Sequence, residues 1–205
     1  MRGETQMSRG TILIDVDDTF LQSSQEIIRQ LNIKNNTNKT LDDLKDYGYK
    51  SIDKNITEQD ILEMYGNQLF FDKVKITNDA TLYINALHDK YNILFASYGD
   101  IHNLRLKEKF LHRLFKLYNW TNARFEGILH QESKSKIQDD ILFAIDNHSQ
   151  HLSEYNAKYK ILFKNYQNVT WNQCPPNSDW YVVNTFKDIF DIVNYIEMLE
   201  KGGYE

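Results

Sequence analysis

Three short apolar runs of the chain each stop at a polar residue. They are TILID, which ends at Asp15, YNILFAS, which ends at Ser97, and ILFAID, which ends at Asp146. Strands of a parallel sheet are covered on both faces, so they read as continuous apolar stretches rather than as alternating ones. Two further runs, YKILF at residues 159–163 and WYVV at residues 180–183, complete a predicted sheet of five parallel strands.

Helical periodicity fills the segments between these runs. The clearest apolar stripes at helical spacing cover residues 78–89, 101–118 and 186–201. The last stripe consists of Phe186, Ile189, Phe190, Val193 and Ile196. Because strand and helix alternate along the chain, the pattern predicts an α/β fold with a doubly wound parallel sheet of Rossmann-like type.

The segment from residue 21 to residue 75 breaks this alternation. It contains helix-start signals, such as Thr57 with Asp60 three positions later, but no apolar run of the strand type. We therefore expect residues 21–75 to form a small helical cap inserted after the first strand. The α/β core would then consist of residues 8–20 and 76–205.

Composition and charge narrow the class of protein. A chain of 205 residues is long enough for one core with a modest cap, and its net charge of -5 disfavours nucleic acid as a partner. No run approaches the roughly 18 apolar residues that a membrane helix needs, and the segment MRGETQMSRG lacks an apolar signal core. The single cysteine, Cys174, cannot form an intramolecular disulfide. We expect a cytoplasmic protein with no membrane segment.

The polar residues at the strand ends carry the candidate chemistry. In open α/β sheets the ligand lies beyond the carboxyl ends of the strands, so Asp15, Asp17, Ser97 and Asp146 should meet there. Three carboxylates suit Mg²⁺, which takes one or two carboxylates together with phosphate oxygens and water. An ionised Asp15 could attack phosphorus to give an aspartyl-phosphate. Asp17 could then protonate the leaving alkoxide and later activate water.

The acidic segment has two simpler interpretations, a solvated turn and a calcium loop. A calcium loop of the EF-hand type that starts at Asp15 needs glycine at its sixth position, where this chain has Phe20. It also needs a helix in front of it rather than TILID, although Glu26 does fall at the twelfth position. These departures disfavour the calcium loop.

Four motifs in a fixed order resemble the haloacid-dehalogenase (HAD) superfamily. DVDDT, residues 15–19, resembles its first motif, D-x-D-x-T after an apolar strand, and Ser97 after ILFA resembles the second, whose hydroxyl binds the phosphoryl group. Lys134 or Lys136 resembles the lysine of the third motif, and ILFAIDN resembles the acidic fourth motif. The resemblance covers most of the chain and implies a magnesium-dependent phosphohydrolase.

Finer features are similar to one branch, the 5'(3')-deoxyribonucleotidase-like proteins. These features are a helical cap after the first motif and the segments LFFDKVKITNDATLYINALHDKYNILFAS, KEKFLHRLF, KSKIQDDILFAIDN and WYVVNTFKDIFDIV. The branch implies a 5'-nucleotidase that acts on (deoxy)nucleoside monophosphates through an aspartyl-phosphate. Alternatives are a phosphatase for another small phosphate ester or for a nucleic-acid 3'-phosphate end, and a catalytically weak nucleotide-binding protein. A homodimer is one possible assembly.

The resemblance also assigns roles to residues. The catalytic candidates are Asp15, Asp17, Lys136 and Lys134, the substrate-binding candidates are Thr19, Ser97, Tyr98, Phe70 and Phe71, and the Mg²⁺ ligands are Asp15, Asp17, Asp146 and Asn147. An ungapped count back from Asp146 favours Lys136 as the lysine that neutralises the phosphoryl charge, with Lys134 close behind. Where the branch has paired aspartates, this chain has Asn147, whose carbonyl can ligate a metal but brings no charge.

Aromatic and histidine residues have two interpretations each. The aromatic residues of the cap could stack on a nucleobase, but such residues more often form a core; they are Tyr47, Tyr49, Tyr65, Phe70 and Phe71. His148 and His151 could be metal ligands, but the hard oxygen cluster favours Mg²⁺ over a metal that prefers imidazole.

Overall fold

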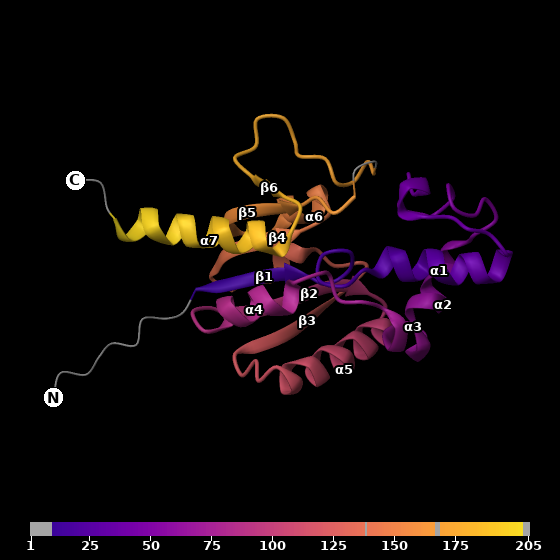
Figure 1. The fold of residues 1–205 in the computed structure, drawn as a ribbon, viewed down its shortest axis with the longest axis horizontal. Helices are drawn as coiled ribbons and strands as arrows, with labels where there is room; N and C mark the ends of the chain where they lie inside the picture. Colours follow the sequence, from indigo (N-terminus) through magenta and orange to yellow (C-terminus); the bar gives the residue numbers. More distant parts are fainter. Residues whose placement is uncertain (1–9, 138, 167–168, 203–205) are drawn as a thin grey trace.

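The computed structural model describes residues 10–137, 139–166 and 169–202. Within them, six parallel strands form one sheet in the order β3-β2-β1-β4-β5-β6 (Figure 1). The strands are β1 (Thr11–Asp15), β2 (Asn92–Gly99), β3 (Ala123–Leu129), β4 (Ile141–Asp146), β5 (Ala157–Phe163) and β6 (Tyr181–Val183). The predicted α/β fold with a doubly wound parallel sheet is confirmed.

The predicted number of strands is wrong by one, because β3 has no apolar run. This strand reads ARFEGIL and lies at the edge of the sheet, where Arg124 and Glu126 remain partly or fully exposed. An edge strand is covered less completely than a central one, so its sequence keeps polar residues. A Cβ at Gly127 would lie 3.1 Å from the side chain of Leu104, so a larger residue here requires Leu104 to shift.

The sheet is covered on both faces. Alternate residues of β1 point into different cores: Ile12 and Ile14 into one, and Leu13 into the other. The first core also takes apolar residues from α4 (Ala80–His88), α5 (Ile101–Leu117) and α7 (Phe186–Lys201). The second core takes Leu152 of α6 (Ser149–Glu154). Two-sided burial explains why the central strands read as unbroken apolar runs.

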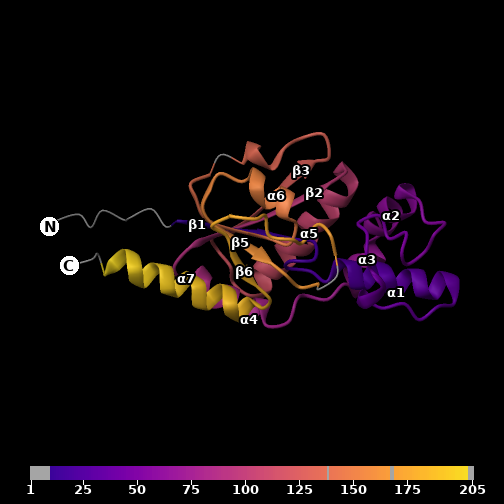
Figure 2. The same ribbon diagram turned by 90° about the horizontal axis from the view of Figure 1, so that it is seen from above.

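Residues 21–75 contain four further helical segments. These are α1 (Ser23–Asn35), the 3-10 turn η1 (Leu41–Asp43), α2 (Glu58–Tyr65) and α3 (Gln68–Lys73). Figures 1 and 2 show α1, α2 and α3 together, at the opposite end of the molecule from the C-terminal end of α7. The predicted start signal is present at α2, where the Thr57 hydroxyl accepts a hydrogen bond from the backbone N–H of Asp60 at 3.1 Å.

Backbone hydrogen bonds join the two ends of this inserted segment. Gln22 N–H donates to the carbonyl of Lys75 at 2.8 Å, and Thr77 N–H donates to the carbonyl of Phe20 at 2.8 Å. These bonds lie next to the predicted cap boundaries, after residue 20 and before residue 76, and the division into core and cap stays a prediction. Residues 8, 9, 138, 167, 168 and 203–205 of the predicted core lie outside the described residues. None of the described helices combines the length and the apolar character needed to cross a membrane.

Candidate active site

The carboxyl ends of β1 and β4 place two aspartates around one lysine. The Lys134 ammonium donates to Asp15 Oδ1 at 2.6 Å and to Asp146 Oδ2 at 2.7 Å. The side chains of Lys134 and Asp146 are fully buried, with 0% exposure each. Asp15 therefore meets residues that lie more than 100 positions later in the chain at this edge of the sheet.

A single 3-10 turn decides which lysine takes this position. The turn η2 (Lys134–Lys136) begins after Ser133, whose hydroxyl accepts a hydrogen bond from the backbone N–H of Ser135. A 3-10 helix has about three residues per turn, so positions 134 and 136 point to different sides. Lys136 is 63% exposed and pairs with Glu132 at 2.7 Å. The preference of the ungapped count for Lys136 is thus not supported by the geometry.

Asp17 belongs to a separate cluster. Its Oδ1 accepts a hydrogen bond from the Ser23 hydroxyl at 2.8 Å, and its Oδ2 accepts one from the Ser97 hydroxyl at 2.9 Å. The Lys107 ammonium pairs with the same Oδ2 and donates to Ser97 Oγ at 2.7 Å. Burial alone would raise the pKa of Asp17, but Lys107 and these hydrogen bonds bring the pKa below its usual value.

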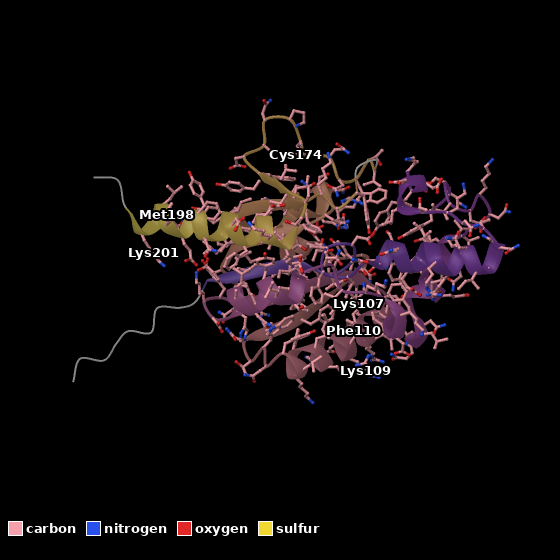
Figure 3. The ribbon with its side chains drawn as sticks, viewed as in Figure 1. Lys107, Lys109, Phe110, Cys174, Met198 and Lys201 are labelled. Carbon is pink, nitrogen blue, oxygen red and sulfur yellow. The ribbon has the colours of Figure 1, made fainter. Side chains whose placement is uncertain are left out.

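Lys107 is a site residue that the sequence analysis missed. It comes from α5, is 2% exposed, and lies on the side of that helix that faces the sheet, whereas Lys109 is on the outer side (Figure 3). The signal was present in the sequence, since Lys107 interrupts the buried apolar stripe that contains Leu104 and Leu111. A charged residue on a buried stripe needs a partner, and Asp17 is that partner.

The predicted Mg²⁺ ligands, three aspartates and Asn147, stay a prediction, and the structure shows which protein groups these side chains contact. Both carboxylate oxygens of Asp17 are engaged by Ser23, Ser97 and Lys107, and the described residues contain no group of three or more His, Cys, Asp or Glu side chains arranged for a metal. The Asn147 side-chain oxygen accepts a hydrogen bond from the Thr19 hydroxyl at 3.4 Å. Asp15 and Asp146 remain as the two carboxylates that share a centre.

Those two carboxylates fit Mg²⁺. Burial and the neighbouring charge of Asp146 raise the pKa of Asp15 well above its usual range, although Lys134 opposes this shift. Crowded buried carboxylates favour a nearby cation, and Mg²⁺ commonly takes one or two carboxylates, phosphate oxygens and water. The calcium-loop alternative is weaker, because Glu26 forms a bidentate pair with Arg29, with N–O distances of 2.7 and 2.6 Å.

Thr19 and Asp18 hold the DVDDT loop in place. Thr19, a predicted substrate-binding residue, is fully buried, and its hydroxyl accepts a hydrogen bond from the backbone N–H of Asn147 at 3.1 Å. Asp18 has a left-handed backbone with φ of 57°, and its carboxylate accepts hydrogen bonds at 2.7 Å from the Ser24 N–H and the Tyr166 hydroxyl. Burial raises the pKa of Asp18 to about 6, against these hydrogen bonds. The loop is thereby joined to α1 and to the fourth-motif segment.

A cavity of about 790 Å³ opens above the two lysine clusters. Asp15, Asp17, Lys107 and Lys134 line it from the core, and Tyr47, Tyr49 and Tyr65 line it from the cap. Small-molecule sites commonly have volumes of about 300–1,000 Å³, so this one can hold a ligand of nucleotide size.

One wall of the cavity is a row of aromatic rings. The imidazoles of His148 and His151 stack with centroids 4.0 Å apart, Tyr47 meets His148 edge-on at 5.6 Å, and Tyr98 meets His151 at 4.8 Å. Burial and the charge of Lys134 lower the pKa of His151 to about 2, and burial also lowers the pKa of His148. Both imidazoles are therefore neutral at pH 7.

The structure does not support substrate contacts by Phe70 and Phe71. These two side chains are 0% and 2% exposed and pack in the core against Tyr65 and Phe110, as aromatic residues of a small cap more often do. The predicted substrate-binding residue Ser97 contacts Asp17 and Lys107, and Tyr98 lines the cavity.

Comparisons by sequence and by structure give different results. No family model and no curated protein matches the sequence. A protein from Clostridium acetobutylicum, described as a predicted phosphatase, matches in structure with a TM-score of 0.61 at 14% identity, over 92% of this chain and 99% of its own. A haloacid-dehalogenase-like hydrolase from Streptococcus pneumoniae matches with a TM-score of 0.59 at 10% identity, over 91% and 98%.

A third match, a HAD-hydrolase from Bacillus subtilis whose structure is bound to magnesium, has a TM-score of 0.51 at 12% identity, over 91% of this chain and 99% of its own. At sequence identities this low, the structural similarity shows the fold alone. The similarity to the deoxyribonucleotidase-like branch stays a prediction. The six-stranded parallel sheet with its flanking helices is the α/β fold of the haloacid-dehalogenase-like hydrolases.

Proposed function

We propose that this chain is a magnesium-dependent phosphatase that hydrolyses nucleoside monophosphates through an aspartyl-phosphate on Asp15. The observation that carries the proposal is the pair of buried lysines at the floor of the cavity, each in contact with a different aspartate of the DVDDT segment. Two ammonium groups can balance the charge of a phosphoryl group. One aspartate can act as the nucleophile and the other as the general acid.

In the first step Asp15 attacks phosphorus with a carboxylate oxygen, and the bond from phosphorus to the leaving oxygen breaks. Asp17 gives a proton to that leaving oxygen. In the second step Asp17 takes a proton from water, whose oxygen attacks phosphorus, and the bond to Asp15 breaks to release inorganic phosphate. A Mg²⁺ ion held by Asp15 and Asp146 would supply charge neutralisation for the phosphoryl oxygens.

The pairing with Lys107 bears on the acid role of Asp17. Lys107 lowers the pKa of Asp17 in the free protein, which favours its carboxylate form. A phosphate dianion near Lys107 would offset that positive charge and raise the pKa of Asp17 again. Substrate binding therefore favours the protonated form that the first step needs.

Removal of divalent metal tests the metal requirement. We expect a chelator such as EDTA to abolish phosphate release and added Mg²⁺ to restore it, because two buried carboxylates and a phosphate together need a hard cation. Phosphate release is measured with a colorimetric assay at several Mg²⁺ concentrations. Full activity in the presence of chelator would contradict the metal requirement.

Substrate choice is tested with a matched panel. The panel contains nucleoside monophosphates, ribose 5-phosphate, which lacks the base, and an oligonucleotide with a 3'-phosphate. We expect the highest kcat/KM for nucleoside monophosphates, since the row of Tyr47, His148, His151 and Tyr98 offers aromatic faces and edges to a planar base. Preference for the oligonucleotide would instead favour a phosphatase for nucleic-acid ends.

The aromatic wall gives a residue-level prediction. We expect His148→Ala to raise KM for nucleoside monophosphates about 10-fold, since base stacking on an aromatic ring contributes about 1–3 kcal/mol. KM for ribose 5-phosphate should change by less than about twofold, because this substrate has no base to stack. Tyr195→Ala, which changes an exposed tyrosine of α7, is the control. Equal effects on both substrates would show that the wall does not recognise the base.

A further inference from the structure

A carboxylate of α6 lies beside the turn that carries Lys134. Oε2 of Glu154 accepts hydrogen bonds from the Ser133 hydroxyl at 2.8 Å, from the Tyr98 hydroxyl at 3.1 Å and from the backbone N–H of Lys134 at 3.1 Å. The same N–H also lies 3.0 Å from the Tyr98 hydroxyl oxygen. One carboxylate oxygen thus joins α6, β2 and η2.

The turn η2 needs such support. It has only three residues, and a helix this short is not stable by itself, because its single turn closes too few hydrogen bonds to offset the cost of ordering it. The side chain of Lys134 nevertheless has to place its ammonium between two buried carboxylates. Its backbone must therefore be held by contacts from outside the turn.

The position of Glu154 is unfavourable for α6 itself. Glu154 is the last residue of that helix, where the helix dipole disfavours negative charge. Its hydrogen bonds to Ser133, to the Lys134 backbone and to Tyr98 lower its pKa even though burial raises it, so the carboxylate stays ionised. The contacts of Glu154 therefore indicate that it supports the turn that carries Lys134, and that it does not serve to stabilise α6.

We propose that Glu154 is a positioning residue that holds the backbone of Lys134 so that the ammonium meets the phosphoryl group. The inference rests on the proposed phosphatase function, in which Lys134 contacts the substrate. Glu154 acts only through Lys134: it fixes where the turn lies, and the lysine provides the positive charge.

The first measurement compares Glu154→Gln with a matched glutamate. Gln keeps the size of the side chain but removes its charge, which weakens hydrogen bonds accepted from Ser133, Tyr98 and Lys134. We expect binding of inorganic phosphate, measured by calorimetry with Mg²⁺ present, to weaken about 10-fold, and kcat/KM to fall by a similar factor. The control is Glu200→Gln, which changes another helix-terminal glutamate whose carboxylate accepts a tyrosine hydroxyl, that of Tyr159 at 2.8 Å.

The second measurement separates positioning from a general structural role. Glu154→Gln is combined with Lys134→Met, and phosphate binding is measured for both single variants, the double variant and the wild-type chain. If Glu154 acts through Lys134, the Gln substitution has less than about a twofold effect once the lysine is absent. An undiminished effect in the Lys134→Met background would overturn the inference.

Should Glu154→Gln fail to fold, Tyr98→Phe removes the other oxygen that contacts the Lys134 N–H, and the same loss of phosphate binding and the same non-additivity with Lys134→Met are expected. An active wild-type chain with an equally active Glu154→Gln overturns the inference alone. A wild-type chain that neither binds phosphate nor hydrolyses any ester overturns the proposed function together with the inference.

Discussion

Asp15→Asn should reduce phosphate release by at least about 10,000-fold, since removal of the nucleophile from a covalent catalyst can cost about 10⁶-fold in kcat. The amide nitrogen and neutral carbonyl of Asn are poor nucleophiles toward phosphorus, so the aspartyl-phosphate does not form. The measurement is turnover of a nucleoside monophosphate at saturating Mg²⁺. It is paired with acid quenching of the wild-type reaction, in which phosphate bound to protein should be trapped.

The control for this prediction is Asp72→Asn, which changes an exposed aspartate of α3 and should leave turnover unchanged. Thermal unfolding confirms that both variants are folded. If Asp15→Asn kept more than about one tenth of wild-type turnover, Asp15 would not be the nucleophile, because nucleophile replacements rarely cost so little. The binding-protein alternative would gain support if the wild-type chain bound nucleotides tightly without releasing phosphate.

Lys134→Met should lower kcat/KM by about 1,000-fold, since one charged group aimed at the charge of a transition state contributes a factor of about 100–1,000. The ammonium of Lys134 lies within 2.7 Å of both Asp15 and Asp146, where the phosphoryl group would approach. Lys136→Met should change kcat/KM by less than about twofold, because an exposed lysine paired at the surface contributes little. Both variants are assayed with the same nucleotide.

Lys134→Met also has an expected effect on stability. Removing one partner of a buried ion pair commonly costs about 3–5 kcal/mol, so the midpoint of thermal unfolding should fall for Lys134→Met and not for Lys136→Met. Assays are therefore run well below that midpoint. If Lys136→Met lost more activity than Lys134→Met, Lys134 would not be the lysine that contacts the phosphoryl group. The ungapped count, which favours Lys136, would then be correct.

The sequence predicts well those strands whose residues form a continuous apolar run. β1 and β4 are buried on both faces, so their apolar runs mark them and end at Asp15 and Asp146. The β3 strand has no such signature, because its place at the sheet edge lets it keep Arg124 and Glu126. The other edge strand, β6, keeps the apolar run WYVV and was therefore predicted, so it is the polar residues at the exposed positions of β3 that hide this strand.

The sequence also does not separate buried from exposed aromatic residues in the cap. Tyr47 and Phe70 both look like candidates for base stacking, yet Tyr47 is 65% exposed beside the cavity and Phe70 is fully buried. The residue type does not distinguish them, since both are aromatic side chains of the same inserted segment. The difference arises from which side of the cap faces the core, and this is a property of packing between segments.

The sequence by itself determined five of the six strands that the structure describes, all except β3, and the meeting of the first and fourth motifs at one edge of the sheet, because parallel strands all present their carboxyl ends there. Only the tertiary structure decided that Lys134 rather than Lys136 contacts Asp15 and that Lys107 rather than Lys134 pairs with Asp17. These outcomes depend on the direction in which a side chain leaves a turn or a helix and on contacts between residues some 80 to 119 positions apart, and the spacing of residues along the chain does not encode either of them.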